Sequence, residues 1–434
     1  MIFRRHDDDE EDEEEIELVR FQGALDGREA DLKANAKLAR MGHGPAKELV
    51  TNALSRRAEK LVVEPKGEKG SLVRLFVDGI PYSGGRLSKQ HGLVITQMLK
   101  LLAGLDVQER RRPQSGGIKA ELAGIPYEIL VDSRPLGGGF ERLILRSRNL
   151  KEPRDTPETI GITPELKAKI RELTADKRGV VVACGPPDSG VSTTALGIMR
   201  SIDAYMYSVS NLADLHGRKL LNVTDFERDP EDDFDTVLGR LVRVEADVVF
   251  LDPIEDPAAA RTIFEWQKKL VLISEMKAKD AAHGIVQLCQ WAGDPAIVAE
   301  GLKAAVSPKL VRLLCTKCRQ AYRPHPKILA KTGLPKTTKA LYRPPRPGEL
   351  DEENGEEAVC ERCGGAGYRG RTAIFQVIEM TPAMQKLVVS GGSSAAIREQ
   401  AAKEGMQTFR SDGLRAVAAG STSLEELQRV FRES

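Results

Sequence analysis

The sequence predicts an α/β domain with a parallel sheet, preceded by a smaller α+β domain. From residue 180 to about 315, short apolar runs typical of buried strands alternate with amphipathic stretches typical of helices. A glycine-rich loop at 185–192 lies between one such strand and the start of a helix. Apolar runs separated by glycine-rich turn signals in 43–150 indicate a second, smaller group of strands and helices.

Composition sets the expected domain boundaries. Residues 7–15 are an unbroken acidic block, so we expect a disordered N-terminal tail over 1–42, with docking to a basic partner as the alternative role of the block. The α+β domain is expected over 43–150. Residues 151–162 are rich in proline and charge and are expected to be a linker. The α/β domain is expected over 163–434.

Two parts of that second domain are expected to differ from the sheet. Residues of about 312–375 contain two cysteine pairs and are expected to form a metal-binding excursion. Within it, residues 343–357 are rich in Pro, Gly and Glu and are expected to be a loop. The stretch 393–434 has helical patterning, so the chain is expected to end in helices.

Charge and hydropathy exclude several classes of protein. The chain has 434 residues, with 65 lysine and arginine residues against 64 acidic ones. This balance points neither to nucleic acid nor to a membrane surface as a partner. The chain has no apolar run of about 18 residues, so no transmembrane segment is expected. The N-terminus has no apolar signal region, and we expect a cytoplasmic location.

The glycine-rich loop follows the phosphate-binding pattern G-x-x-x-x-G-K-[ST] without its lysine. Val191 stands at the lysine position and cannot neutralise the β- and γ-phosphates of a nucleotide. Backbone amides can still cradle phosphate, and Ser192 can still reach a magnesium ion, so binding of ATP with Mg²⁺ stays open. The alternative is that Ser192 and Thr193 only begin the helix. The candidate nucleotide-binding residues are Gly185, Pro186, Pro187, Asp188, Ser189, Gly190, Val191, Ser192 and Thr193.

Four of the six cysteines form two Cys-x-x-Cys pairs. Two such pairs supply the four thiolates that tetrahedral zinc prefers, and a closed shell of four thiolates indicates a structural site. The alternative is four free thiols. The lone Cys184 and Cys289 are expected to be small buried apolar residues. The candidate zinc ligands are Cys315, Cys318, Cys360 and Cys363.

Three long segments resemble the ATPases of type II secretion and type IV pilus assembly, namely 98–114, 360–372 and 404–426. The resemblance covers roughly residues 45–434. It implies a RecA-like P-loop domain with a zinc excursion and a helical C-terminal part. It also implies a hexameric ring, of one or of two related chains, that lies in the cytoplasm at the inner membrane and works with the platform proteins of a secretion or pilus system.

The catalytic motifs depart from the pattern of that family. Asp188 replaces a glycine, the acidic box falls at 209–212 without its carboxylates, and Lys277 stands in place of a histidine. Asp252 and Glu255 are out of register with the expected Walker B glutamate. We interpret the chain as a catalytically impaired pseudo-ATPase that acts as a structural or regulatory subunit. The alternative is an active motor with a rewired site that uses Asp252, Glu255 and Lys277.

Overall fold

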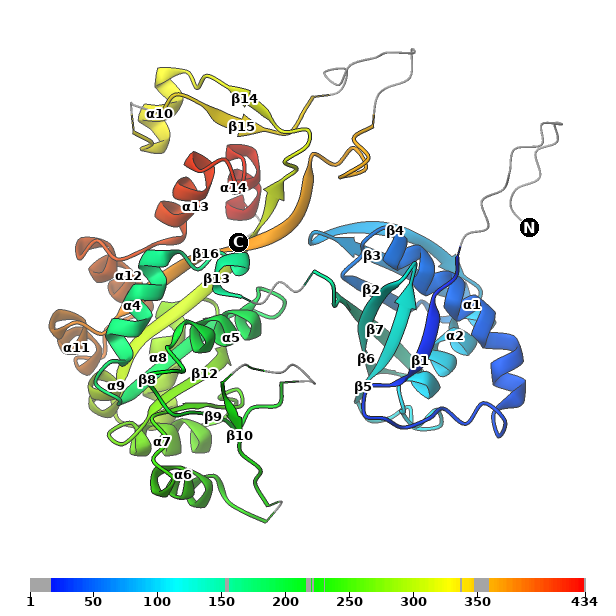
Figure 1. The fold of residues 1–434 in the computed structure, drawn as a ribbon, viewed down its shortest axis with the longest axis horizontal. Coiled ribbons are helices and arrows are strands. Elements are labelled where there is room, and N and C mark those ends of the chain that lie inside the picture. The colour runs from blue at the N-terminus through cyan, green and yellow to red at the C-terminus, as the bar shows by residue number, and fades with distance from the viewer. Residues whose placement is uncertain are drawn as a thin grey trace. The chain divides into compact units, whose positions relative to one another are not determined.

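A computed structural model shows two compact units that divide between residues 153 and 154 (Figure 1). Each unit has its own sheet and its own hydrophobic core. The structure describes residues 17–152, 156–215, 220, 222–229, 231–335, 338–346 and 359–432. The acidic block at 7–15 lies outside the described residues.

The N-terminal unit is an antiparallel sheet packed against two helices. The strand order is β1-β5-β6-β7-β2-β3-β4. Helices α1 (Ala36–Ser55) and α2 (Lys89–Leu102) contribute to one core with the sheet. The other elements are β1 (Arg20–Ala24), β2 (Lys60–Pro65), the short 3₁₀ helix η1 (Gly67–Lys69), β3 (Ser71–Val77), β4 (Ile80–Leu87), β5 (Gln114–Leu122), β6 (Ile125–Gly137) and β7 (Phe140–Asn149). This is the α+β architecture that the sequence predicts.

Two local features of this unit differ from the expectation. The glycine pair in Ser83-Gly84-Gly85 was expected to mark a turn, but β4 continues through it and the register with β3 shifts there. Gly85 has a φ of +93°, so the glycines form a bulge within the strand. The tail expected over 1–42 also contains β1 and the first turns of α1, where Gly42 packs closely against Val94 of α2.

The C-terminal unit has a seven-stranded sheet in the order β10-β9-β11-β12-β8-β13-β16. All neighbouring strands are parallel except the antiparallel pair β13 and β16. The strands are β8 (Gly179–Gly185), β9 (Val209–Asn211), β10 (Thr224–Asp225), β11 (Val248–Phe250), β12 (Val271–Lys277), β13 (Leu302–Leu314) and β16 (Tyr368–Glu379). The predicted α/β domain with a parallel sheet is confirmed.

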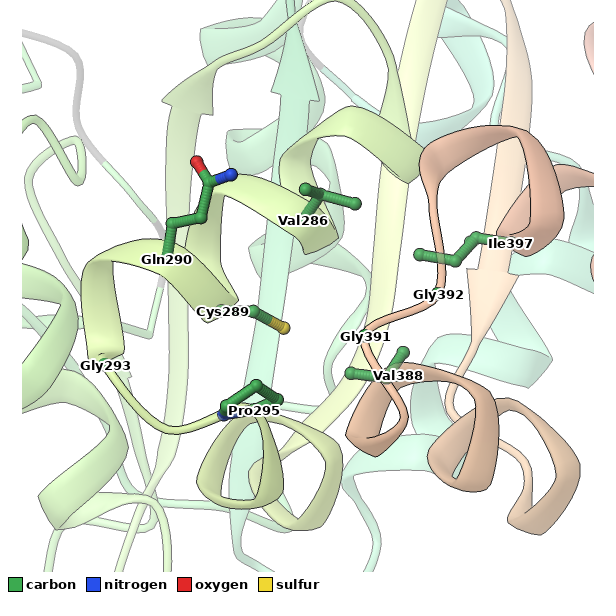
Figure 2. A pocket seen from close by; sticks show the side chains of 9 residues that line it. All are labelled: Val286, Cys289, Gln290, Gly293, Pro295, Val388, Gly391, Gly392 and Ile397. Atoms are coloured by element: carbon green, nitrogen blue, oxygen red, sulfur yellow. The ribbon is translucent and has the colours of Figure 1, made fainter.

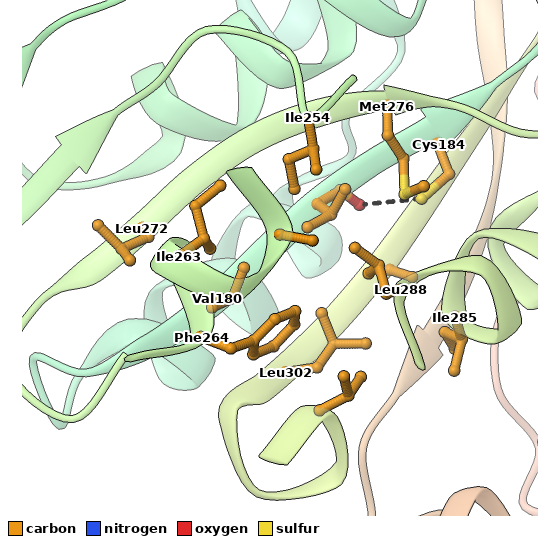
Figure 3. Close-up of a cluster of buried hydrophobic side chains, with 14 of the residues drawn as sticks. Val180, Cys184, Ile254, Ile263, Phe264, Leu272, Met276, Ile285, Leu288 and Leu302 are labelled. Carbon is orange, nitrogen blue, oxygen red and sulfur yellow. Dashed lines mark hydrogen bonds between the residues drawn. The ribbon is translucent and has the colours of Figure 1, made fainter. Parts of the chain in front are cut away.

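Helices cover both faces of this sheet. One face packs against α3 (Pro157–Ile160), α4 (Pro164–Thr174) and α5 (Val191–Ser201). The other packs against α6 (Phe234–Arg243), α7 (Pro257–Trp266), α8 (Ala281–Ala292), α9 (Pro295–Gly301), α11 (Pro382–Val389) and α12 (Ser394–Lys403). Figure 3 shows part of this second core, in which Phe264 of α7 and Leu288 of α8 lie over the sheet and Cys184 is buried as expected.

The stretch 151–162 does more than connect the two units. Its described residues include α3, and Ile160 and Ile162 are buried in the core beneath α5. A Cβ at Gly197 of α5 would lie 2.2 Å from Ile160 Cδ1, which shows how closely the two segments pack. The expectation of a plain linker is therefore wrong for the described residues 156–162.

A small insertion lies between β13 and β16. It contains β14 (Gln320–Tyr322), α10 (Pro326–Thr332) and β15 (Leu341–Arg343), and β14 pairs with β15. Leu329 and Leu341 of the insertion share a core with the C-terminal helices α13 (Phe409–Ala418) and α14 (Leu424–Arg432). The helical end of the chain is confirmed. Most of the loop expected over 343–357 lies outside the described residues.

Helix α14 is held to β13 by one buried carboxylate. Glu426 accepts hydrogen bonds from the backbone N–H and the guanidinium of Arg312, at 2.7–3.0 Å, and from the guanidinium of Arg429 at 2.6 and 2.9 Å. Burial acts to raise the pKa of Glu426, but the hydrogen bonds from Arg429 and Arg312 prevail and lower it to about 2.

The hydrogen bonds of Glu426 predict that the packing of α14 on β13 is less stable in acid. Because the pKa is lowered on folding, the stabilisation is present above the unfolded pKa and is lost as the pH falls through the range between the two values. We expect Glu426→Gln to cost about 2 kcal/mol at neutral pH, after allowance for solvent screening. The cost should shrink as the pH falls from about 5 toward 3, as measured by thermal unfolding of both proteins. A cost that stays constant over that range would contradict this account.

Candidate functional site

The glycine-rich loop joins β8 to α5, as the sequence predicts. Gly190 precedes the helix with a φ of +93°, a backbone conformation that favours glycine. Asp188 also has a positive φ, of +63°, in the loop. A Cβ at Gly185 would lie 2.6 Å from Ser189 Oγ and 2.7 Å from Val191 Cγ2, so these two side chains lie against the first residue of the loop.

Val191 packs against the core at the start of α5. Its side chain is half-buried and packs on the apolar cluster beneath α5. A lysine at this position would carry its ammonium group to bound phosphates, whereas an isopropyl group can only add to the core. The order of strand, glycine-containing loop and helix is therefore present, without the cation that this position supplies in the phosphate-loop pattern.

Ser192 is hydrogen-bonded to a residue of the neighbouring strand. Its hydroxyl donates to Glu275 Oε1 at 2.8 Å. Glu275 lies near the carboxyl end of β12, which pairs with β8 along the whole length of the latter. In the phosphate-loop pattern Ser192 occupies the magnesium position, and the sequence pattern gives Glu275 no role. The contact joins residues 83 positions apart, so the register of two parallel strands decides it.

The three candidate catalytic residues have two different sets of partners. Lys277 Nζ lies 3.4 Å from Glu255 Oε1, and both side chains are mostly exposed. Asp252 lies elsewhere at this edge, where its Oδ1 accepts a hydrogen bond from the backbone N–H of Asp214 at 2.9 Å. The structure thus pairs Lys277 with Glu255 and gives Asp252 the role of holding a loop.

The strand expected to carry the acidic box holds an amide instead. Asn211, at the end of β9, is buried and its Nδ2 donates to Asp225 Oδ1 at 2.8 Å and to the carbonyl of Ala213 at 3.1 Å. The Oδ1 atom of Asn211 accepts from the backbone N–H of Ala213. The side chain is therefore committed to the loop that follows β9, and β9 itself contributes no carboxylate.

The four cysteines of the two Cys-x-x-Cys pairs lie together, with all sulfur atoms within 4.8 Å of one another. Cys315 Sγ lies 3.9 Å from Cys360 Sγ, and Cys318 Sγ lies 3.7 Å from Cys363 Sγ. A tetrahedral ion with bonds of about 2.3 Å to sulfur requires sulfurs about 3.8 Å apart. The cluster therefore has the spacing that a tetrahedral metal ion requires.

The surroundings act on the thiols of the cluster in opposite directions, since burial raises the pKa of Cys318 and of Cys363. Burial acts to raise the pKa of Cys360, but N–H groups of Cys363 and Arg362 outweigh it and lower that pKa to about 7. Lys317 is ion-paired with Glu361 at 2.9 Å on the surface. Arg319, the residue after Cys318, donates to the carbonyl of Gly420 and stacks on Tyr342.

A polar network that the sequence did not reveal joins α8 to α12. Asp280 caps α8 and accepts hydrogen bonds from His283 and from Arg398, both at 2.8 Å. His283 Nε2 in turn lies 3.3 Å from Ser394 Oγ. The only sequence signals were local, Asp280 at a helix start with His283 three positions later, because Ser394 and Arg398 lie more than 100 positions further along the chain.

A separate hollow lies between α8, α9, α11 and α12 (Figure 2). Its volume is about 350 Å³, and its lining is mainly apolar, with Val286, Val388 and Ile397 facing the space. The lining offers the amide of Gln290 and the thiol of Cys289, and burial raises the pKa of that thiol to about 11. With no charged side chain in its lining, this hollow does not suit a polyphosphate.

Comparisons with known proteins identify the family. The sequence profile named type II/IV secretion system protein matches residues 42–429. The chain belongs to this family. Among curated members of the type II/IV secretion system family, it is 28% identical over 392 residues to the type II secretion system protein HxcR of Pseudomonas aeruginosa, covering 89% of this chain and 76% of the relative. It is 27% identical over 391 residues to the type IV pilus assembly ATPase PilB of Thermus thermophilus.

That second alignment covers 88% of this chain and 42% of PilB, so the chain spans less than half of that relative. Solved structures agree on the fold. The ATPase DotB of Legionella pneumophila matches with a TM-score of 0.55 at 11% identity, covering 89% of this chain and 95% of DotB. The pilus retraction motor PilT with bound ADP matches with a TM-score of 0.50 at 14% identity, covering 88% and 96%. The resemblance to the secretion and pilus assembly ATPases is thereby confirmed.

Across the described parts of the chain, none of the helices combines the length and the apolar character needed to cross a bilayer. This agrees with the expectation from the hydropathy of the sequence.

Proposed function

We propose that this chain is a structural or regulatory subunit of a secretion or pilus assembly machine and that it does not hydrolyse ATP. The observation that carries the proposal is Val191, an uncharged, half-buried side chain that packs against the apolar cluster at the position where the phosphate-loop pattern has its lysine. The commitment of Asn211 to its own loop adds to it. Phosphoryl transfer depends mainly on positioned charge, so each such loss removes about 10²–10³ in rate.

Membership of the family supports a proposal for the assembly. In this proposal the chain joins a hexameric ring, either with copies of itself or with a related active ATPase. The ring lies in the cytoplasm and contacts inner-membrane platform proteins. The reason to keep an inactive subunit is that subunit and platform contacts persist when the catalytic chemistry is lost.

The four-cysteine cluster is proposed to hold zinc. Four sulfur ligands at tetrahedral spacing suit Zn²⁺, and a shell without an open position indicates a structural role. When bound, the ion would join the loop after β13 to the loop before β16. It would thereby close the insertion that contains β14, α10 and β15.

The proposal predicts that the protein has no ATPase activity. Purified full-length chain with Mg-ATP is expected to release phosphate at the background rate, because Val191 carries no charge at the position of the lysine that neutralises the phosphates. The measurement is phosphate release at several protein concentrations, with a Ser192→Ala variant as the control for contaminating activity. Release above background that is lost in Ser192→Ala would contradict the proposal.

An active motor with a rewired site is the second candidate. The observation in its favour is Lys277, which pairs with Gly185 in the register of β12 and β8 and carries an exposed ammonium group. In that case Lys277 would leave Glu255 and neutralise phosphate. Magnesium-dependent release of phosphate that disappears in Lys277→Ala would support this second function over the first.

A further inference from the structure

Glu275 faces the helix that follows the phosphate loop. Alternate residues of β12 point to opposite faces of the sheet. Val271 and Ile273 lie in the core on the side of α5, while Leu272 and Met276 lie in the core on the other side. Glu275 continues the first series, and the hydrogen bond from Ser192 at 2.8 Å confirms that its carboxylate lies at the start of α5.

The start of α5 is the place where a phosphate-bearing ligand would bind. The helix has 11 residues, and Gly190 before it provides no side-chain cap. A helix N-terminus carries partial positive charge and attracts anions. In the phosphate-loop pattern, the hydroxyl at the position of Ser192 binds the magnesium ion of the nucleotide. Here that hydroxyl donates a hydrogen bond to the carboxylate of Glu275.

We infer that Glu275 is a specificity-determining residue that excludes phosphate-bearing ligands from loop 185–192. This inference rests on the proposed function and adds a separate cause to it. Val191 removes an attraction for phosphate, whereas Glu275 places a negative charge beside the phosphate position and engages the Ser192 hydroxyl. The carboxylate thus acts as an internal anion at this helix terminus.

The inference predicts that adding the missing lysine will not restore binding while Glu275 is present. Full-length Val191→Lys is expected to bind Mg-ATP or inorganic pyrophosphate no better than wild type. The double variant Val191→Lys with Glu275→Gln is expected to bind at least about tenfold more tightly, measured by calorimetric titration. Glutamine keeps the shape and can still accept from Ser192, so this change removes mainly the charge.

The matched control is Glu300→Gln in the same Val191→Lys background. Glu300 lies on α9, and its carboxylate pairs with Lys268 on the surface at 2.9 Å. This control makes the same chemical change away from the loop and should leave binding unchanged. If Val191→Lys does not fold, as judged by its thermal unfolding, the same comparison is made between wild type, Glu275→Gln and Glu275→Thr.

Each possible result of the binding experiments either supports or overturns the role inferred for Glu275. Equal binding with and without Glu275, including no binding by any variant, overturns the inference. Binding of Mg²⁺ or Mn²⁺ alone that Glu275→Gln abolishes also overturns it, because the carboxylate and Ser192 would then form a cation site. Nucleotide binding by wild type without phosphate release overturns only this inference. Phosphate release by wild type overturns the proposed function, so the two failures are distinguishable.

Discussion

The Cys360→Ser variant is expected to lose its metal and to expose the insertion between β13 and β16 to protease. Apparent binding free energies of structural zinc are on the order of 10 kcal/mol, comparable with the whole stability of a domain, which is about 5–15 kcal/mol. In the residues of the insertion that the structure describes, the elements are two three-residue strands and one short helix. Without the ion, the described part of the insertion is held by the pairing of β13 with β16 and by its apolar contacts with α13 and α14.

The damage should extend beyond the insertion. Leu329, Leu334 and Leu341 share a core with Val417 of α13 and Leu427 of α14, so these helices lose packing when the insertion opens. We expect a chelator to produce the same protease pattern as Cys360→Ser, together with a lower midpoint of thermal unfolding. The measurements are metal content per chain, limited proteolysis and thermal unfolding.

The control for this experiment is Cys289→Ser. Cys289 is one of the two cysteines outside the cluster, and it lies on α8 beside the apolar hollow. This variant should keep one metal ion per chain and the protease pattern of the wild type. A Cys360→Ser protein with full metal content, or a metal-free wild type with an intact insertion, would contradict the structural role of the cluster.

The parts of the molecule that depend on neighbouring residues could be predicted from the sequence. The buried strand, the glycine-rich loop and the helix of 179–201 follow one another directly, and each has a local signal in composition. The two Cys-x-x-Cys pairs also carry their own signal, because the spacing within each pair already presents two thiolates to one ion. The C-terminal helices were predictable from their periodicity.

The parts that depend on strand register could not be predicted. Ser192 meets Glu275 only because β8 and β12 are neighbours in one particular register. The glycines at 84 and 85 have the composition of a turn, and only pairing with β3 shows that they form a bulge. Lys100 did have a signal, since a lone charge within the apolar run of α2 indicates a buried partner, but the sequence does not say which residue that partner is.

That partner is Glu141, and the pair yields the second large prediction. Both side chains are almost fully buried, and Lys100 Nζ donates to Glu141 Oε1 and to the carbonyl of Glu109, each at 2.6 Å. Ser133 Oγ donates to the same Glu141 oxygen at 2.7 Å. The network joins α2, β6, β7 and the loop that precedes β5.

Lys100→Met is expected to destabilise the N-terminal unit by about 3–5 kcal/mol, because it leaves the Glu141 carboxylate charged and buried without its cation. The double variant Lys100→Met with Glu141→Leu should cost less than Lys100→Met alone. It leaves only the hydroxyl of Ser133 and the carbonyl of Glu109 without these partners, at a cost of about 1–3 kcal/mol. Hydrogen exchange of the α2 and β7 amides in the full chain measures the change, since a chain of two units need not unfold in one step.

Lys89→Met is the control on the same helix. Lys89 pairs with Glu68 at the exposed start of α2, where an ion pair contributes less than about 1 kcal/mol. The same chemical change therefore separates burial from charge as the cause of the loss. If Lys100→Met costs no more than Lys89→Met, or if the double variant costs the sum of the two single changes, the buried pair does not act as a unit. In that case the apolar packing of α2 would hold the loop before β5 without help from the buried charges.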